Sequence, residues 1–395
     1  MGDVFLKRKK KILVVTGSRS EYGLFYNILK LIKSSKELDL LLVVTGMHLS
    51  PEFGYTVNEI IQDGFSISEQ VEMVVSSDNP VGIAKSMGLG MIGFADCFKR
   101  LQPDLLLILG DRYEIFAAAS AAMALNIPIA HISGGDLTEW TMDEQIRHAI
   151  TKMSHLHFVA IEQHAERVRQ MGEEKWRVNV VGEPCIDNIN SIDKLTKGQI
   201  SKILGINFNR TTVLVTYHPV TLEVENTTVH IQNLLKALDR VDAEVVFTYP
   251  NADSGGRVII SKIENFRKTH PNTKVFKSLG VKLYLNLLSH VDVIVGNSSS
   301  GIVEAPSFKV PAVNIGKRQQ GRLFAENTIC TTEETESISR GIEKALSHEF
   351  RKSLLHMKNP YDKGGAAKKI IRVLTGVEIT PKLRNKKFIE DGRNA

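Results

Sequence analysis

The chain has 395 residues, of which 43% are hydrophobic and 24% are charged, and its formal net charge is +6. This length exceeds the size at which one hydrophobic core stops growing, so we expect two domains of about 180 residues each. The three cysteines lie far apart without a CxxC pair, and the chain has neither an apolar run of about twenty residues nor a signal peptide. These features argue against a disulfide-stabilised secreted protein and a membrane protein, and they predict a cytoplasmic one.

A basic run at residues 7–11 precedes the first predicted strand. Such a run can bind nucleic acid or acidic lipid, but more often it is a solvated chain terminus. We therefore expect neither a nucleic-acid partner nor a membrane partner.

The first half of the chain alternates predicted strands and helices. Its aliphatic runs end at glycines or turn residues, as do strands that are buried on both faces of a parallel sheet. We predict strands at residues 11–16, 38–44, 105–109, 127–132, 158–160 and 178–182, and helices at residues 21–34, 83–100 and 117–125. This alternation implies an α/β domain with right-handed crossovers.

The pattern is interrupted at residues 182–202 and then resumes, so we divide the chain into domains at residues 1–185 and 186–360. In the second domain we predict strands at residues 212–216, 244–248, 274–276, 291–295 and 311–315, and helices at residues 227–238, 258–266 and 281–288. A terminal helix is predicted at residues 360–375. In the domain division, residues 361–380 form a separate segment. The charged tail, residues 381–395, is expected to be loose.

The segment from residue 105 to residue 148 has the densest group of polar residues at predicted strand ends. Ligands of open α/β sheets bind outside the carboxyl ends of the strands. The strand that contains His131 and the strand before it end at glycines, and the charged residues that follow are Asp111, Arg112, Glu114, Asp136, Glu139, Asp143, Glu144, Arg147 and His148. We therefore predict an active site in this segment.

Four of these carboxylates, Asp111, Glu114, Asp143 and Glu144, suit an acid–base set. Like charges in a cleft spread their pKa values, so that one carboxyl acts as an acid and another as a base. The alternative is that they are helix-start carboxylates, stabilised by the helix dipole and by neighbouring arginines. For Glu114 and Glu144 this alternative is at least as well supported.

Residues 291–304 read as a strand, a turn of small residues and the start of a helix. Helix amides and the hydroxyls of Ser298 and Ser299 suit a phosphate, whereas the alternative is an ordinary serine-rich N-cap. The segment lacks the lysine of a P-loop and the glycine spacing of a dinucleotide site, which argues against NTPase and NAD-dependent functions. Glu304 is placed to accept both hydroxyls of a ribose.

Other basic residues also follow predicted strand ends. Arg19, His48, His218 and the loop at residues 317–322, which contains Arg318, are candidates for phosphate contacts. The alternative for each is a structural histidine or a solvated basic loop. The histidines and carboxylates show neither HExxH nor a closed Cys/His spacing, so no metal site is expected.

In combination these features resemble the hydrolysing UDP-N-acetylglucosamine 2-epimerases of bacterial sialic-acid and related nonulosonic-acid synthesis. The resemblance covers about residues 11–375. Its motifs are TGSRSEYG at 16–23, GDRYE at 110–114, HIxGG at 131–135, DExxRHAITKMS at 143–154, GNSSSG at 296–301 and RQxGR at 318–322.

The resemblance implies a GT-B architecture, in which two Rossmann-like domains face a cleft and the final helix returns to the first domain. It also implies a UDP-sugar ligand, neither metal nor NAD, and a homo-oligomer, either a dimer or a tetramer. It assigns UDP binding to Arg19, His218, Ser298, Ser299, Gly301, Glu304 and Arg318. It assigns the sugar side and catalysis to His48, Asp111, Arg112, His131, Asp143, Glu144 and Arg147.

One position departs from the family pattern. Some relatives carry a glutamate two residues after the histidine of HIxGG, where this chain has Ser133. That glutamate is a candidate acid or base in those relatives. Its role is therefore absent here or filled by another group, such as Asp136, which itself stands where a glutamate is common.

The implied reaction removes the C2 proton of UDP-N-acetylglucosamine while UDP leaves C1, and water then adds to the 2-acetamidoglucal intermediate. N-acetylmannosamine and UDP result, as the first step of sialic-acid synthesis, with Asp111 or Asp143 as base or acid. Three alternatives stay open. They are hydrolysis of UDP-2,4-diacetamido-2,4,6-trideoxyglucose for legionaminic acid, a non-hydrolysing epimerase, and a glycosyltransferase or nucleotide-sugar-binding regulator with the same fold.

Overall fold

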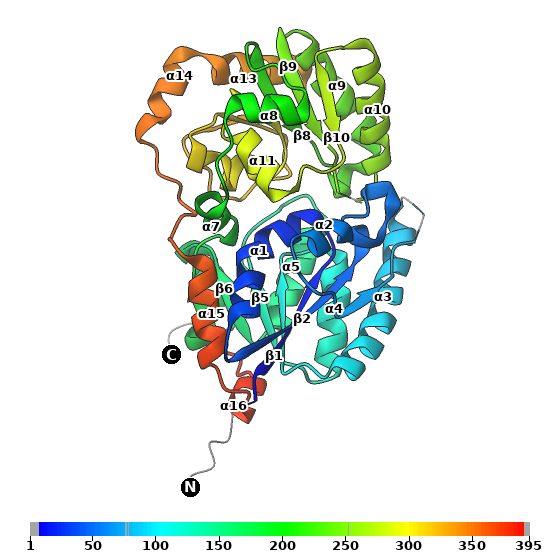
Figure 1. The fold of residues 1–395 in the computed structure, drawn as a ribbon, viewed down its shortest axis with the longest axis vertical. Coiled ribbons are helices and arrows are strands. Elements are labelled where there is room, and N and C mark those ends of the chain that lie inside the picture. Colours follow the sequence, from blue (N-terminus) through cyan, green and yellow to red (C-terminus); the bar gives the residue numbers. More distant parts are fainter. Residues whose placement is uncertain (1–7, 76, 78, 252, 391–395) are drawn as a thin grey trace.

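Two parallel sheets, each covered by helices, form the lower and upper halves of the molecule in Figure 1. This computed structural model describes residues 8–75, 77, 79–251 and 253–390. Lys7 of the basic run and residues 391–395 of the tail lie outside the described residues. The expected α/β fold with two Rossmann-like domains in a GT-B-like arrangement is confirmed.

The first domain contains a seven-stranded sheet in the order β3-β2-β1-β4-β5-β6-β7, and its strand pairs are parallel. Its strands are β1 (Lys10–Thr16), β2 (Leu38–Thr45), β3 (Glu69–Val71), β4 (Leu105–Leu109), β5 (Ile129–Ile132), β6 (Leu156–Val159) and β7 (Val178–Val180). Its helices include α1 (Arg19–Ser34), α2 (Val57–Gln62), α3 (Pro80–Leu101), α4 (Tyr113–Ala124), α5 (Met142–Met153) and α6 (Glu162–Gln170).

Side chains alternate between two cores along β1. Ile12 and Val14 lie in the core that includes residues of α1, whereas Leu13 and Val15 lie in the core that includes residues of α3 and α4. Successive residues of a strand point to opposite faces, so a strand covered on both faces needs an uninterrupted apolar run. This is why the runs in the sequence located the strands well.

The second domain contains a six-stranded parallel sheet in the order β10-β9-β8-β11-β12-β13. Its strands are β8 (Thr211–Thr216), β9 (Ala243–Thr248), β10 (Thr273–Phe276), β11 (Val293–Gly296), β12 (Ala312–Ile315) and β13 (Thr328–Thr331). Its helices are α8 (Lys197–Leu204), α9 (Thr227–Asp239), α10 (Gly256–Thr269), α11 (Gly280–Leu288), α12 (Ser300–Val303), α13 (Thr335–Leu346) and α14 (His348–Ser353). Short 3₁₀ turns lie at Gly46–Leu49, Pro51–Phe53, Lys175–Arg177, Thr221–Asn226, Ala305–Phe308 and Leu354–His356.

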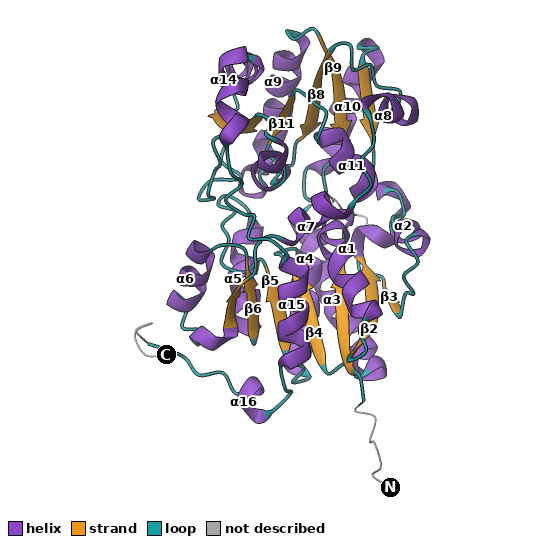
Figure 2. Ribbon diagram, turned by 60° about the vertical axis from the view of Figure 1, so that its left-hand side comes forward, coloured by secondary structure: helices purple, strands orange, loops and turns teal. Residues whose placement is uncertain are grey.

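The chain crosses between the domains twice. Helix α7 (Pro184–Ser191) still packs on α1, where Asn188 Nδ2 donates to the Gly23 carbonyl at 2.6 Å. The chain therefore leaves the first domain after α7. It returns through α15 (Ala366–Gly376), which packs on α1 and α7 and lies beside the first sheet in Figure 2. This returning helix begins six residues later than the predicted start at residue 360.

Helix α3 confirms the helix predicted at residues 83–100 and is longer at its amino-terminal end, although the sequence analysis expected no apolar run of about twenty residues. It has 22 residues, and its most apolar window has a mean hydropathy of 1.3, so by length and composition alone it is also suited to cross a membrane. Phe94 and Phe98 on this helix lie in the core of the first domain, and α3 packs along α4. In this fold it is a covering helix of the first sheet.

The expectation of a loose tail is wrong for residues 381–390. Arg177 is fully buried and donates to the carbonyls of Leu383 and Asn385 at 2.9 and 3.1 Å, on and just after α16 (Pro381–Arg384). Further along, Lys386 Nζ lies 2.9 Å from a Glu173 carboxylate oxygen. The backbone carbonyls of the tail thus bind the buried Arg177, and Lys386 of the tail pairs with the buried Glu173. Composition alone does not reveal this tertiary arrangement.

Ending the chain after Thr380 is expected to lower the free energy of unfolding by about 1–3 kcal/mol, because Arg177 loses carbonyl partners that a buried charge needs. Urea unfolding measures this change. A chain that ends after Glu390 is the matched control and should unfold like the full chain. Equal stability of all three proteins would contradict the docked tail.

Candidate active site

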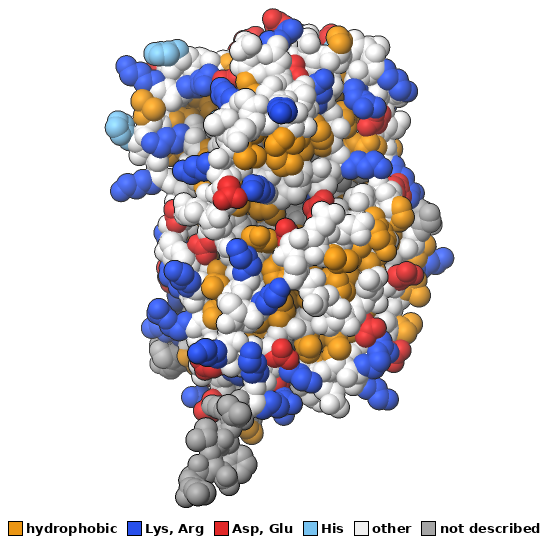
Figure 3. Space-filling model, viewed as in Figure 1, with side chains coloured by type: hydrophobic (Ala, Val, Ile, Leu, Met, Phe, Trp, Pro, Cys, Tyr) orange, Lys and Arg blue, Asp and Glu red, His pale blue; other side chains and the backbone are white. Residues whose placement is uncertain are grey.

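The carboxyl ends of the two sheets face each other across a groove, which hollows the face of the molecule seen in Figure 3. A cavity of about 200 Å³ lies there, and we call it the cleft cavity. Its lining includes Arg19, Glu59 and Asn188 of the first domain and His218, Tyr284, Ser298, Ser299, Glu304 and Arg318 of the second domain. Six of the seven residues assigned to UDP therefore line one cavity.

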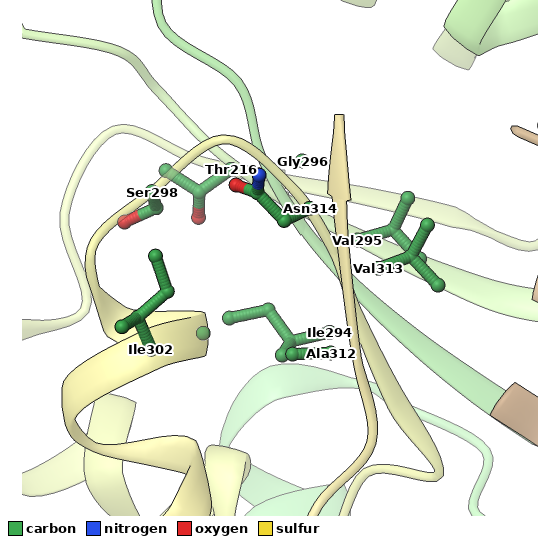
Figure 4. A pocket seen from close by; sticks show the side chains of 10 residues that line it. Thr216, Ile294, Val295, Gly296, Ser298, Ile302, Ala312, Val313 and Asn314 are labelled. Atoms are coloured by element: carbon green, nitrogen blue, oxygen red, sulfur yellow. The ribbon is translucent and has the colours of Figure 1, made fainter. Parts of the chain in front are cut away.

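The loop after β11 forms one wall of the cleft cavity. At Gly296 φ is +137°, and a Cβ there would collide with the Thr216 carbonyl oxygen, so only glycine allows this turn. Below the turn lies a small pocket of about 10 Å³, with Ser298, Thr216 and Asn314 at one end and aliphatic side chains at the other (Figure 4). Gly301 lines this small pocket rather than the cleft cavity.

The helix that begins in this loop is shorter than the sequence suggested. Helix α12 is a single turn, and Glu304 caps its carboxyl end. A one-turn helix has little macrodipole, so phosphate binding here depends on hydroxyls, exposed amides and nearby arginines. Burial raises the pKa of Glu304, and a hydrogen bond with Ser300 opposes that rise.

Two arginines bring positive charge to the cleft cavity from opposite domains. Arg19 donates through Nη2 to the Tyr249 carbonyl at 2.9 Å, and its buried Nη1 has no hydrogen-bond partner among the described residues. Arg318 donates through Nη1 to the Asn297 carbonyl at 3.1 Å. Burial lowers the pKa of both side chains. A buried, incompletely paired guanidinium is stabilised by an anion, which suits a diphosphate.

His218 lies beside these arginines at the end of β8. Burial, and secondarily the Arg318 charge, lower its pKa to about 3, so its imidazole is neutral at physiological pH. A neutral imidazole can donate a hydrogen bond to a phosphate oxygen but adds no charge.

An acidic group lies next to Arg318. Asp111 accepts a charged hydrogen bond from Arg147 Nη2 and a weaker one from Thr138 Oγ1 at 3.4 Å. Asp143 Oδ2 lies 4.0 Å from Arg318 Nη2. Burial, and then the charges of Asp111 and Asp253, raise the pKa of Asp143 to about 8. Asp143 therefore holds a proton for much of the time near neutral pH.

Arg112 joins the two domains through buried ion pairs. Its Nη2 lies 3.1 Å from Glu114 Oε1 and its Nη1 lies 3.0 Å from Asp253 Oδ1. Asp253 was missed by the sequence analysis, although it follows the end of β9 by five residues. The rule that polar residues after strand ends converge would have included it.

His48, His131 and Glu144 do not line the cleft cavity, and each is engaged in structural contacts. His48 lies between the hydroxyls of Thr16 and Thr56, at 3.0 and 2.8 Å. His131 Nε2 lies 2.7 Å from the Gly110 carbonyl oxygen and therefore donates to it. Glu144 accepts from the Thr138 amide at 2.6 Å and lies 3.0 Å from His148 Nε2.

Two acids lie near Ser133, where some relatives have a glutamate, and their contacts differ. Asp136 forms an ion pair with Arg322 at 2.8 Å and lies 3.3 Å from His164, whose pKa is lowered by burial to about 4. Burial raises the pKa of Asp136, but the charges of Arg322 and other neighbours lower it by more than burial raises it. The net effect is a lowered pKa. Ser133 Oγ donates to Glu183 Oε1 at 3.1 Å. Glu183 was not among the predicted residues.

One group among the described residues has possible metal ligands close together. Side-chain atoms of Glu223, His230 and Glu333 lie within 4.8 Å of one another. Glu223 already pairs with Lys317 at 3.3 Å, and none of the three residues lines the cleft cavity. This group takes no part in the chemistry considered below.

The buried histidines predict a stability that depends on pH. Burial lowers the pKa of His48 and of His131 from 6.5 to about 3. The unfolded chain therefore binds more protons between these values, and the free energy of unfolding falls as the pH drops below 6.5. Replacing His48 by Asn should reduce the loss between pH 7 and pH 5 by about 2 kcal/mol.

Urea unfolding at the two pH values measures this loss, and the partly exposed His270 provides the control. Slight burial of His270 is outweighed by its bonds to Asp239 and to the Phe266 carbonyl, which raise its pKa. His270→Asn should therefore enlarge the loss. The same change for both variants would rule out the buried histidine as the cause.

Comparison with known proteins identifies the family of this chain. A family model described as UDP-N-acetylglucosamine 2-epimerase matches residues 30–375. A Campylobacter jejuni protein named GDP/UDP-N,N'-diacetylbacillosamine 2-epimerase (hydrolyzing) is 41% identical over 347 residues, which cover 87% of this chain and 90% of that protein. A Legionella pneumophila protein named UDP-N,N'-diacetylbacillosamine 2-epimerase (hydrolyzing) is 36% identical over 377 residues, covering 95% of this chain and 98% of that one.

The crystal structure of UDP-GlcNAc 2-epimerase from Neisseria meningitidis bound to UDP-GlcNAc has the same fold. The TM-score is 0.78 at 19% identity, and the match covers 92% of this chain and 99% of that one. The resemblance carried by the motifs is therefore confirmed, and the chain belongs to the UDP-N-acetylglucosamine 2-epimerase family.

Proposed function

We propose that this protein is a hydrolysing UDP-sugar 2-epimerase, which releases UDP and inverts C2 of a 2-acetamido sugar. One observation carries the proposal. The proton-bearing carboxyl of Asp143 lies beside Arg318, and Arg318 also lines the cavity that suits UDP. A group that exchanges protons is thus adjacent to the position where a diphosphate would leave.

In the first step we assign as the base the ionised fraction of the Asp143 carboxyl, whose pKa of about 8 leaves part of it ionised near neutral pH. It takes the C2 proton, the electrons of the C2–H bond form the C1=C2 double bond, and the electrons of the C1–O bond leave with UDP. A base is most effective when its pKa lies near the working pH, which favours Asp143 over Asp111, the carboxylate engaged with Arg147. The product of this step is a 2-acetamidoglycal.

The leaving UDP gains negative charge as the C1–O bond breaks. Arg19, Arg318 and the hydroxyls of Ser298 and Ser299 line the cavity where this charge develops. Donors held in position before the reaction stabilise developing charge without reorganisation, so they lower the barrier of this step. In the second step water adds to C1 and a proton returns to the opposite face of C2.

For the substrate, we propose UDP-2,4-diacetamido-2,4,6-trideoxyglucose. The support is that the Campylobacter and Legionella relatives are both named for diacetylbacillosamine, which is this sugar. The second candidate is UDP-N-acetylglucosamine, which would give N-acetylmannosamine for sialic-acid synthesis, and the family description supports it. The two sugars differ at C4 and C6.

A comparison of kcat/KM for the two UDP-sugars, with released UDP as the readout, distinguishes these candidates. We expect at least a tenfold preference for the diacetamido sugar, because a site built to bind a second acetamido group leaves polar groups unpaired with the wrong sugar. A preference for UDP-N-acetylglucosamine would overturn this substrate. Inverted UDP-sugar without free UDP would indicate a non-hydrolysing epimerase, and no reaction with either would favour a transferase or a binding protein.

A pair of variants separates binding from chemistry. Asp143→Asn should lower kcat by about 10²–10⁴-fold without weakening UDP binding, because it removes only the proton acceptor. Glu304→Gln should weaken UDP binding measured by calorimetry, because it removes a charged acceptor for ribose hydroxyls. Full turnover by Asp143→Asn in a folded protein would eliminate Asp143 as the base.

We further propose that the protein is a cytoplasmic homo-oligomer, either a dimer or a tetramer. Exposed apolar side chains on α3, namely Val81, Leu89 and Ile92, support an association surface. The free cysteines, of which Cys97 and Cys185 are buried, support a reducing compartment.

A further inference from the structure

Glu183 lies where the first domain ends, between β7 and α7. It is the N-cap residue of α7, and its amide donates to the Tyr361 carbonyl at 3.2 Å. Its side chain points back toward the loop after β5, where the Ser133 hydroxyl donates to its carboxylate at 3.1 Å. Two strand ends of the first sheet thus meet through one hydrogen bond.

Glu183 differs from Asp111 and Asp136 in its lack of a cationic partner among the described residues. Arg147 is engaged by Asp111, and Arg322 is engaged by Asp136. No ion pair of Glu183 occurs among the described residues, although both arginines lie near enough to affect its pKa. Burial, and then the charge of Asp136, raise the pKa of Glu183 to about 7. Near neutral pH this carboxyl therefore both holds and releases a proton.

The hydrogen bonds connect Glu183 to the sugar side of the site. Ser133 donates to Glu183, and the Ser133 carbonyl accepts from Arg147 Nη1 at 2.9 Å. The other arm of Arg147 holds Asp111. The charged neighbours of Glu183 are Asp136, Arg322 and Arg147, whereas those of Asp143 are Asp111, Asp253, Arg318 and Arg112. Glu183 and Asp143 therefore have different charged neighbours, and Asp111 or Arg147 is among those of each.

We propose that Glu183 is the second acid–base residue of this site, the one that returns a proton to C2 of the glycal intermediate. This inference rests on the proposed hydrolysing epimerase. Inversion at C2 needs one group that removes a proton on one face and another that delivers a proton on the other face. Asp136, whose charge acts on Glu183, is held as an anion chiefly by Arg322 and has no proton to give.

The step balances without a cofactor. The Glu183 carboxyl gives its proton to C2, the electrons of the C1=C2 double bond form the new C2–H bond, and C1 becomes an oxocarbenium centre. Water attacks C1 and loses a proton, which restores the Glu183 carboxyl directly or through solvent. The product is the free 2-acetamido sugar with inverted C2.

The second step should therefore slow as the pH rises past about 7, where Glu183 loses its proton. The groups that surround this carboxyl from the packed elements are Ser133, Asp136, Arg147, Cys185, Arg322 and Tyr361. The Ser133 hydrogen bond stabilises the ionised form and lowers the pKa of Glu183. Its removal should move the pH limit of this step upward.

The test uses Glu183→Gln, which keeps the shape and removes the proton. Wild-type protein and variant are each given the UDP-sugar, and UDP release and glycal are followed separately by proton NMR. We expect UDP release in the first turnover to change less than tenfold, while hydration of added 2-acetamidoglycal with UDP falls by about 10²-fold or more. The glycal should then accumulate.

Ser133→Ala is the second variant, and it also tests the assignment of Glu183 if Glu183→Gln does not fold. Its glycal hydration should persist to higher pH than that of the wild type. Normal hydration by Glu183→Gln, equal loss of UDP release and hydration, or an unmoved pH limit in Ser133→Ala would each overturn the assignment. Failure of the wild type itself to release UDP would instead overturn the proposed function.

Discussion

The structure depends on arginines that reach across the groove to carboxylates of the opposite domain. Arg112 of the first domain meets Asp253 of the second, and Arg318 and Arg322 of the second meet Asp143 and Asp136 of the first. Buried charges are costly unless they are paired, so these contacts fix how the two sheets face each other. The cleft cavity lies beside these contacts, and Arg318 belongs to both.

This arrangement distributes charge unequally among the acids. Asp136 has a close cationic partner in Arg322, whereas Asp143 lies 4.0 Å from Arg318. Among the described residues the Glu183 carboxylate has one hydrogen-bond partner, the Ser133 hydroxyl. Desolvation without full compensation raises proton affinity, and this creates two proton-exchanging carboxyls in one region. Arg318 lines the cleft cavity and also lies 4.0 Å from Asp143, so a diphosphate bound in the cavity would change the charge around this carboxyl.

The sequence predicted the architecture well and the site in part. Continuous apolar runs located the central strands, because strands covered on both faces tolerate little else. The edge strand β13 and the docked tail were missed, since their stability comes from partners far along the chain. Strand-end reasoning found Asp111, Asp143 and Arg318. It gave a structural histidine as the alternative for His48, which the hydrogen bonds of His48 support. It did not predict that His131 would bond to Gly110 or that Glu183 would contact Ser133, because such contacts depend on side-chain direction in three dimensions.

The central claim is that C2 exchanges its proton with solvent while the bond to UDP is hydrolysed. Proton NMR of the wild-type protein in deuterated water, with UDP-2,4-diacetamido-2,4,6-trideoxyglucose and separately with UDP-N-acetylglucosamine, tests it most directly. The account predicts free UDP and a released sugar that has inverted C2 and carries deuterium there. Release of UDP with the original proton and configuration at C2 would mean simple hydrolysis and would contradict the account, as would intact substrate in both samples.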